Sequence, residues 1–242
     1  MKKINKRPQP TEIQQWRAAN AGIHANLRYN SGGFPRSAVL KALLVEQGNL
    51  CAYTLLKIDD NKAHIEHLKP QNKCLAEDDE REAHGRGRKC EDVEWRNMVA
   101  CFPQPGADHP RFGAVEKNEW WHKTDFVSPL AQNCELRFRY EKDGKIHAVN
   151  DTDNAVKTTI IKLRLHSKRL EELRKKAIMQ AGLHKSSPKA IRSVSTVEQL
   201  IKRLKEKPAD GYLEFCTVLE QVAIDYIKAL QKRAKRRRHV VA

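Results

Sequence analysis

The chain has 242 residues, with 46 Lys and Arg against 30 Asp and Glu, and a formal net charge of +16 at pH 7. This length can bury a hydrophobic core without disulfides or oligomerisation. No apolar run approaches the roughly 20 residues that cross a bilayer, which argues against a membrane-spanning protein. The positive charge favours a polyanionic partner, most simply nucleic acid, although a basic surface without such a partner is the alternative.

Two helices are expected before residue 50. The segment PTEIQQWRAAN has helical spacing after Thr11, a candidate N-cap, and FPRSAVLKALLVEQG is amphipathic and stopped by Gly48. Both segments are interpreted as scaffold. Residues 1–49 are therefore predicted to be an N-terminal helical segment.

A β-hairpin is predicted next in the chain. Residues 50–58 have the composition of a strand, DDNK that of a turn, and residues 63–68 that of a second short strand. The polar, glycine-containing stretch of residues 76–94 is predicted to be a mobile surface loop. Apolar residues return with WRNMVACF.

The distal part of the chain is predicted to contain a hairpin followed by helices. Residues 134–149 alternate around Asp143-Gly144, which is the strongest short hairpin signal. Residues 154–182 have the spacing of one helix, HKSSPK that of a loop, and residues 210–238 that of a last helix with a basic end.

The stretch His64-Ile65-Glu66-His67 places two imidazoles and a carboxylate in four consecutive positions. Alternation along a strand puts His64 and Glu66 on one face and His67 on the other. A carboxylate is a ligand for Mg²⁺ or Mn²⁺, and a neutral imidazole can take a proton from water near neutral pH. Surface strands also carry such residues without a function, so the stretch alone leaves both interpretations open.

The pattern CAY at residues 51–53, AHIEHLKP at 63–70 and EWRNMVAC at 94–101 resembles the HNH (ββα-metal) nucleases. More narrowly, it is similar to the PtuB-type branch of Septu and retron anti-phage systems, as are the later segments FVSPLAQNCELRFRYEKDGKI and TTIIKLRLHSKRLEELRKKA. The resemblance implies an α+β fold with a nuclease core at residues 50–122. The N-terminal segment and a C-terminal hairpin and helical region with a basic tail, residues 123–242, would wrap this core.

The resemblance also implies a role for each motif residue. Glu66 corresponds to the first metal ligand, His67 to the general base that activates water, and Asn97 to the residue whose amide holds the base-bearing loop. His64 would position Glu66 or bind the ion through water, and its alternative is simple packing on the hairpin. One ion and one oriented imidazole meet the minimum for phosphodiester hydrolysis.

The cysteine pattern departs from that of many HNH proteins, which pin the core with two CxxC pairs around zinc. Here the corresponding stretches read Cys51-Ala-Tyr-Thr54 and Cys101-Phe-Pro-Gln104, so a structural zinc is not expected. The implied cofactor is a divalent Mg²⁺ or Mn²⁺ ion.

The third metal-ligand position is not marked clearly in the sequence. Asp108 and His109 are the candidates, and Asn118 is the reserve. Three basic residues near the motif are expected to contact nucleic acid, namely Lys69, Arg96 and Lys117.

The expected function is metal-dependent cleavage of DNA or RNA, with tRNA among the targets. The resemblance implies an effector subunit of an anti-phage complex with an ATPase (PtuA-like) subunit, together with a retron reverse transcriptase and its nucleic acid. The alternative is a non-catalytic nucleic-acid-binding adaptor that kept the hairpin but lost the metal. Six cysteines without a CxxC pair and the polar start MKKINKRPQP predict a cytoplasmic location.

Overall fold

The computed structural model describes residues 1–103 and 111–241, without the side chains of His24 and of residues 237–241. The first elements are α1 (Thr11–Ala19), η1 (His24–Asn26), α2 (Arg36–Gln47), β1 (His64–His67), α3 (Gln71–Ala83), η2 (Glu91–Val93), η3 (Trp95–Asn97), β2 (Met98–Cys101) and α4 (Ala114–Lys117). They are followed by α5 (Cys134–Arg137), β3 (Phe138–Tyr140), β4 (Ile146–Ala148), α6 (Asn154–Lys162), α7 (Lys168–Gln180), α8 (Val194–Lys205) and α9 (Cys216–Val241). Helices combined with small antiparallel sheets confirm the predicted α+β class.

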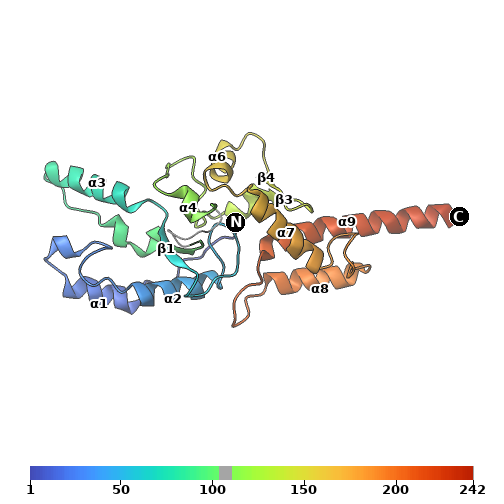
Figure 1. Ribbon diagram of the computed structural model, residues 1–242, viewed down its shortest axis with the longest axis horizontal. Helices are drawn as coiled ribbons and strands as arrows, with labels where there is room; N and C mark the ends of the chain where they lie inside the picture. The colour runs from blue at the N-terminus through green and yellow to red at the C-terminus, as the bar shows by residue number, and fades with distance from the viewer. Residues whose placement is uncertain (104–110, 242) are drawn as a thin grey trace.

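The molecule is elongated, and β1 lies between helices near one end. Figure 1 shows α1 and α2 along one side of this end and α3 along the other, with β1 between them. At the opposite end, α8 packs along α9, and α9 continues outward to the C-terminus.

The first sheet consists of β1 and β2, which pair antiparallel. Glu66 lies opposite Val99, and His67 lies opposite Met98. The expected strand at residues 63–68 is therefore present, but the predicted hairpin with residues 50–58 is wrong, because the partner strand comes after α3. The side-chain amide of Gln47 at the end of α2 closes the other edge of β2, accepting from the N–H of Ala100 at 2.7 Å and donating to its carbonyl at 2.9 Å.

Residues 50–58 form a tight, buried turn instead of a strand. A single β-bridge joins Leu50 to Lys57. Inside it, the N–H of Leu55 donates to the carbonyl of Cys51 at 3.1 Å, and Leu55 has a positive φ of 67°. The segment is apolar because the core surrounds it. A buried turn and a buried strand can have the same apolar composition, so composition alone does not distinguish them.

The first part of the stretch predicted as a loop, residues 76–83, is helical, because α3 continues to Ala83. Its run of Ala, Glu, Asp and Arg lacks Gly and Pro and has high helix propensity, which outweighs its polarity. The helix ends before Gly85, whose φ is 67°. The buried carboxylate of Asp78 then accepts from the N–H groups of Lys89 and Cys90 at 2.7 and 3.1 Å, which ties the remaining irregular segment to α3.

The N-terminal helices agree with the prediction except for one cap. Gly48 ends α2 in the left-handed conformation, as expected. Thr11 is the first helical residue of α1 and Pro10 precedes it, so the predicted Thr11 N-cap is wrong. The fixed φ of proline suits a helix start without a side-chain cap.

The distal hairpin is confirmed, since β3 pairs antiparallel with β4 and Arg139 lies opposite His147. The helix predicted for residues 154–182 is two helices. Arg164 has a positive φ of 45°, and the hydroxyl of Ser167 caps α7 by accepting from the N–H of Leu170. The sequence analysis made no prediction for α8, although its buried residues Val197 and Leu204 lie on one helix face.

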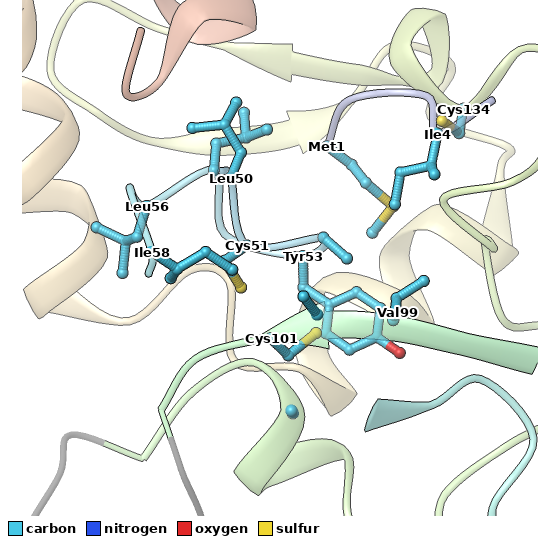
Figure 2. Packing of buried hydrophobic residues seen from close by; sticks show 14 of the residues in the cluster. Met1, Ile4, Leu50, Cys51, Tyr53, Leu56, Ile58, Val99, Cys101 and Cys134 are labelled. Atoms are coloured by element: carbon cyan, nitrogen blue, oxygen red, sulfur yellow. The ribbon is translucent and has the colours of Figure 1, made fainter. Parts of the chain in front are cut away.

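One buried cluster contains residues from all three predicted segments. Figure 2 shows part of it, with Met1 and Ile4 from the N-terminal segment, Tyr53 beside Val99, and Cys134 from the C-terminal region. The three predicted segments, divided at 49/50 and 122/123, therefore share one core. Their division into separate domains remains a prediction. Over the ranges that the structure describes, no helix has both the length and the apolarity required to cross a membrane.

Candidate functional site

A groove of about 510 Å³ opens beside β1. Its walls come from β1, from the start of α3 and from α4 with the residues that follow. The lining residues are His64, Ile65, Glu66, His67, Pro70, Gln71, Asn72, Ala114, Val115, Lys117, Asn118 and Glu119. The structure thus brings the histidine and glutamate motif to a concave surface.

His64 and Glu66 form one side of this groove. The Nε2 atom of His64 lies 3.8 Å from Oε2 of Glu66, and their side chains are 17% and 14% exposed. The other ring nitrogen of His64, Nδ1, is buried and has no hydrogen-bond partner among the described residues. Two donors on the same strand face can therefore approach one ligand, as the alternation along the strand predicts.

Lys117 holds the second oxygen of Glu66. Its ammonium lies 2.8 Å from Oε1 of Glu66 and donates a 2.8 Å hydrogen bond to the carbonyl of His67. The Lys117 side chain is only 1% exposed. Its predicted contact with nucleic acid would therefore have to be made from the groove wall and not from an open surface.

The backbone of α4 is fixed from behind. The N–H of Gly113 donates to the carbonyl of Leu163 at 2.8 Å. Glu116 forms an ion pair with Arg164 at 3.5 Å. Gly113 has a φ of 67°, and a Cβ there would lie 3.2 Å from the carbonyl oxygen of Phe102, so glycine is needed where α4 begins.

His67 is held in one orientation and one protonation state. Its side chain is buried, and Nε2 lies 2.8 Å from the carbonyl oxygen of Asp92, so Nε2 carries the proton. Nδ1 then accepts from the side-chain amide of Gln71 at 3.2 Å. Burial lowers the pKa of the imidazole to about 4, which keeps the ring neutral at neutral pH.

Asn97 links the end of β1 to the loop that contacts His67. Its Oδ1 accepts from the N–H of Lys69 at 2.8 Å, and its Nδ2 donates to the carbonyls of Lys69 and Glu91 at 3.0 Å each. Asp92 follows Glu91 directly and provides the carbonyl that binds His67. The Asn97 amide therefore holds Lys69, at the end of β1, and Glu91, next to Asp92, in fixed positions on either side of the His67 imidazole.

Tyr29 and Asp92 also support His67, and the sequence analysis did not identify either of them. The rings of Tyr29 and His67 meet edge to face with centroids 4.6 Å apart. The N–H of Tyr29 donates to the carboxylate of Asp92 at 2.9 Å. Neither residue belongs to a recognisable local motif, since each reaches His67 only through the tertiary fold.

The other two predicted nucleic-acid contacts are placed differently from each other. Lys69 is buried, and its ammonium lies 2.6 Å from Glu77 on α3 and 2.5 Å from Glu91 on η2. Arg96 on η3 is exposed. Lys69 thus joins two elements behind the groove, whereas Arg96 offers its guanidinium to solvent.

The described residues place one candidate for the third metal ligand at the groove. Asp108 and His109 lie outside the described residues. Asn118, the reserve candidate, lines the groove just after α4. Cys51 and Cys101 are buried in the core, where Cys51 Sγ accepts from the N–H of Phe102 at 3.4 Å.

Glu66 and His64 are the residues of the groove that could hold a divalent ion. Between residues 1–103 and 111–241, no cluster of three or more His, Cys, Asp or Glu side chains is arranged to hold a metal ion. Mg²⁺ keeps several waters and is commonly bound by one or two carboxylates plus substrate phosphates. Oε2 of Glu66 and the imidazole of His64 offer two donors for this mode, whereas Oε1 faces the ammonium of Lys117, whose charge opposes a second cation.

Compared with known proteins, the chain matches no protein-family model, and no curated protein is significantly similar to it in sequence. A function is therefore inferred from the groove and its residues.

Proposed function

We propose that this protein is a metal-dependent endonuclease of the HNH, ββα-metal type that hydrolyses phosphodiester bonds of DNA or RNA. One observation carries the proposal: Glu66 and His67 line one groove, and the His67 imidazole is oriented by the carbonyl of Asp92. Asp92 follows Glu91, whose own carbonyl accepts a hydrogen bond from Asn97. A carboxylate beside an oriented neutral imidazole is the minimal pair for metal-assisted attack by water.

His67 is the general base in this proposal. Its Nδ1 is the ring atom with a free electron pair for a proton, because Nε2 donates to Asp92. Attacking water reaches Nδ1 by displacing the amide of Gln71, which now donates to it. Asn97 acts through the loop and is a positioning residue.

Glu66 and His64 are the residues that would hold a divalent ion in the groove. When bound, Mg²⁺ or Mn²⁺ supplies Lewis-acid stabilisation of the phosphate oxygens. The ββα unit then consists of β1, β2 and α4, with α4 forming the opposite wall. Arg96 and the net charge of +16 support attraction of a polyanionic substrate.

The test is cleavage of plasmid DNA, single-stranded DNA and an RNA mixture that includes tRNA, each with Mg²⁺ or Mn²⁺. His67→Ala should reduce the rate by about 10²–10⁴, Glu66→Gln should abolish the response to metal, and EDTA should stop the wild-type reaction. His147→Ala, which removes an exposed histidine from β4, is the matched control. Cleavage by His67→Ala at the wild-type rate would refute the assignment of the base.

A non-catalytic nucleic-acid-binding adaptor is the second candidate. The ion pair between Lys117 and Glu66 favours it, because the ammonium already neutralises the carboxylate that a metal ion needs. An adaptor would bind the same nucleic acids but leave them intact under all metal conditions. His67→Ala would then leave the measured affinity unchanged.

The resemblance to PtuB-type proteins supports a wider proposal, in which the chain is the effector of a cytoplasmic anti-phage complex. An ATPase (PtuA-like) subunit would control it, with a retron reverse transcriptase and its nucleic acid as further members. Leu213, just before α9, and Ile224 on α9 are 44% and 42% exposed and offer apolar contacts. Deletion of residues 208–242 would remove buried Phe215 and Val218, so Ile224→Asp is the cleaner variant.

Co-expression with such an ATPase should give a complex on size-exclusion chromatography, and Ile224→Asp should weaken that complex. The free chain should cleave nucleic acid slowly. A chain that remains alone in the co-expression and cleaves freely would refute control by the ATPase, while leaving the nuclease proposal intact.

A further inference from the structure

We infer that Lys117 couples metal binding to nucleic-acid binding, because its ammonium holds Glu66 in the free protein and transfers to a phosphate when nucleic acid enters the groove. This inference rests on the proposed function. Lys117 is then not a simple surface contact for nucleic acid. It lowers the affinity of the site for its ion until substrate binds.

The contacts of Lys117 place a cation where a divalent ion would be attracted. Its Nζ lies 2.8 Å from Oε1 of Glu66, and the side chain is almost fully buried. A divalent ion between Oε2 and His64 would share the same carboxylate with this ammonium. Like charges on one carboxylate repel strongly in a groove from which water is partly excluded, so the free site has low metal affinity.

The ammonium can change its partner without movement of the backbone. The backbone of α4 stays in place because Gly113 and Glu116 attach it to Leu163 and Arg164. The side chain of Lys117 has a flexible four-carbon stem, and its ammonium has three donors. A phosphate oxygen carries a negative charge, as the Glu66 carboxylate does, so it can replace Glu66 as the ionic partner of the ammonium while the hydrogen bond to the His67 carbonyl keeps the side chain in the groove.

Lys69, the other buried lysine near the motif, does not share this property. Its ammonium is held by carboxylates from two other elements, Glu77 and Glu91. Removing Lys69 would loosen the support of the groove, whereas removing Lys117 changes the charge on Glu66 itself. Lys117 is therefore the residue whose substitution tests the coupling.

The experiment measures Mn²⁺ affinity by isothermal titration calorimetry on the full chain. All variants carry His67→Ala, so that added oligonucleotide stays intact. Lys117→Met removes the charge and keeps the aliphatic stem, Lys117→Arg keeps the charge, and Lys123→Gln removes an exposed lysine outside the groove as the matched control. Circular dichroism and thermal unfolding establish that each variant is folded.

Lys117→Met should bind Mn²⁺ about tenfold more tightly than its parent in the absence of nucleic acid. Lys117→Arg and Lys123→Gln should bind like the parent, and Glu66→Gln should remove the gain. A 12-nucleotide single-stranded DNA, or the RNA of the same sequence, should tighten Mn²⁺ binding by the parent and by Lys123→Gln but not by Lys117→Met, after subtraction of binding to the oligonucleotide.

Two results overturn the inference and are distinguishable. If Mn²⁺ binds through Glu66 but Lys117→Met leaves the affinity unchanged or lowers it, the coupling is refuted and the proposed metal-dependent function stands. If neither parent nor Lys117→Met shows binding that depends on Glu66, with or without oligonucleotide, the proposed function fails together with the inference.

Discussion

Replacing Asn97 with alanine should destabilise the protein and loosen the loop that orients His67. The substitution removes three hydrogen bonds of 2.8–3.0 Å, two of them to Lys69 and one to Glu91. At about 1 kcal/mol for each hydrogen bond, the free energy of unfolding should fall by about 3 kcal/mol. For a domain of this size the melting temperature should fall by about 6–12 °C.

Two assays check this prediction. Urea unfolding followed by circular dichroism gives the loss of unfolding free energy, with Asn154→Ala at the exposed start of α6 as the control that should change it by about 0.5 kcal/mol or less. Hydrogen exchange should increase at residues 84–93, because the Glu91 carbonyl loses its donor. An Asn97→Ala protein that melts like wild type with unchanged exchange would refute the bridging role.

Two further substitutions test the support of the fold and of the groove. Asp153 caps α6, and its ion pair with Arg137 holds the pKa of the carboxyl below its ordinary value. Asp153→Asn should therefore lower the unfolding free energy at pH 7 by about 1–2 kcal/mol, and acid titration of unfolding should show this difference disappearing as the pH falls through the lowered pKa, where wild type also loses its charge. Gly113→Ala should cost about 1–2 kcal/mol in urea unfolding, because its Cβ would meet the Phe102 carbonyl at 3.2 Å at a positive φ; unchanged stability would contradict this reasoning.

Local patterns predicted the strands better than their partners. The distal hairpin was predictable because its turn, Asp143-Gly144, lies between the two strands that it joins. The alternation at residues 64–67 likewise located β1. Its pairing with β2 across α3 depends on the core and on the Gln47 amide, and neither contributes a signal within a short window of sequence.

The candidate site divides in the same way. Glu66 and His67 stand out because they are adjacent, whereas Tyr29 and Lys117 reach them only in the folded chain. Lys117 was expected to contact nucleic acid, but its burial was not predicted, since lysines are rarely fully buried unless they are paired. The one available signal was its position among the apolar residues of FGAVEK.

The attachment of α4 to Leu163 and Arg164 has a consequence for protein synthesis. A ribosome that adds about 5–20 residues per second needs about 5–20 s to proceed from Glu66 to Arg164. During this interval the nascent chain contains the motif on β1 but not the residues that anchor the opposite wall. The groove, and any activity that it supports, therefore arises late in translation, and products that terminate before Leu163 should be inert.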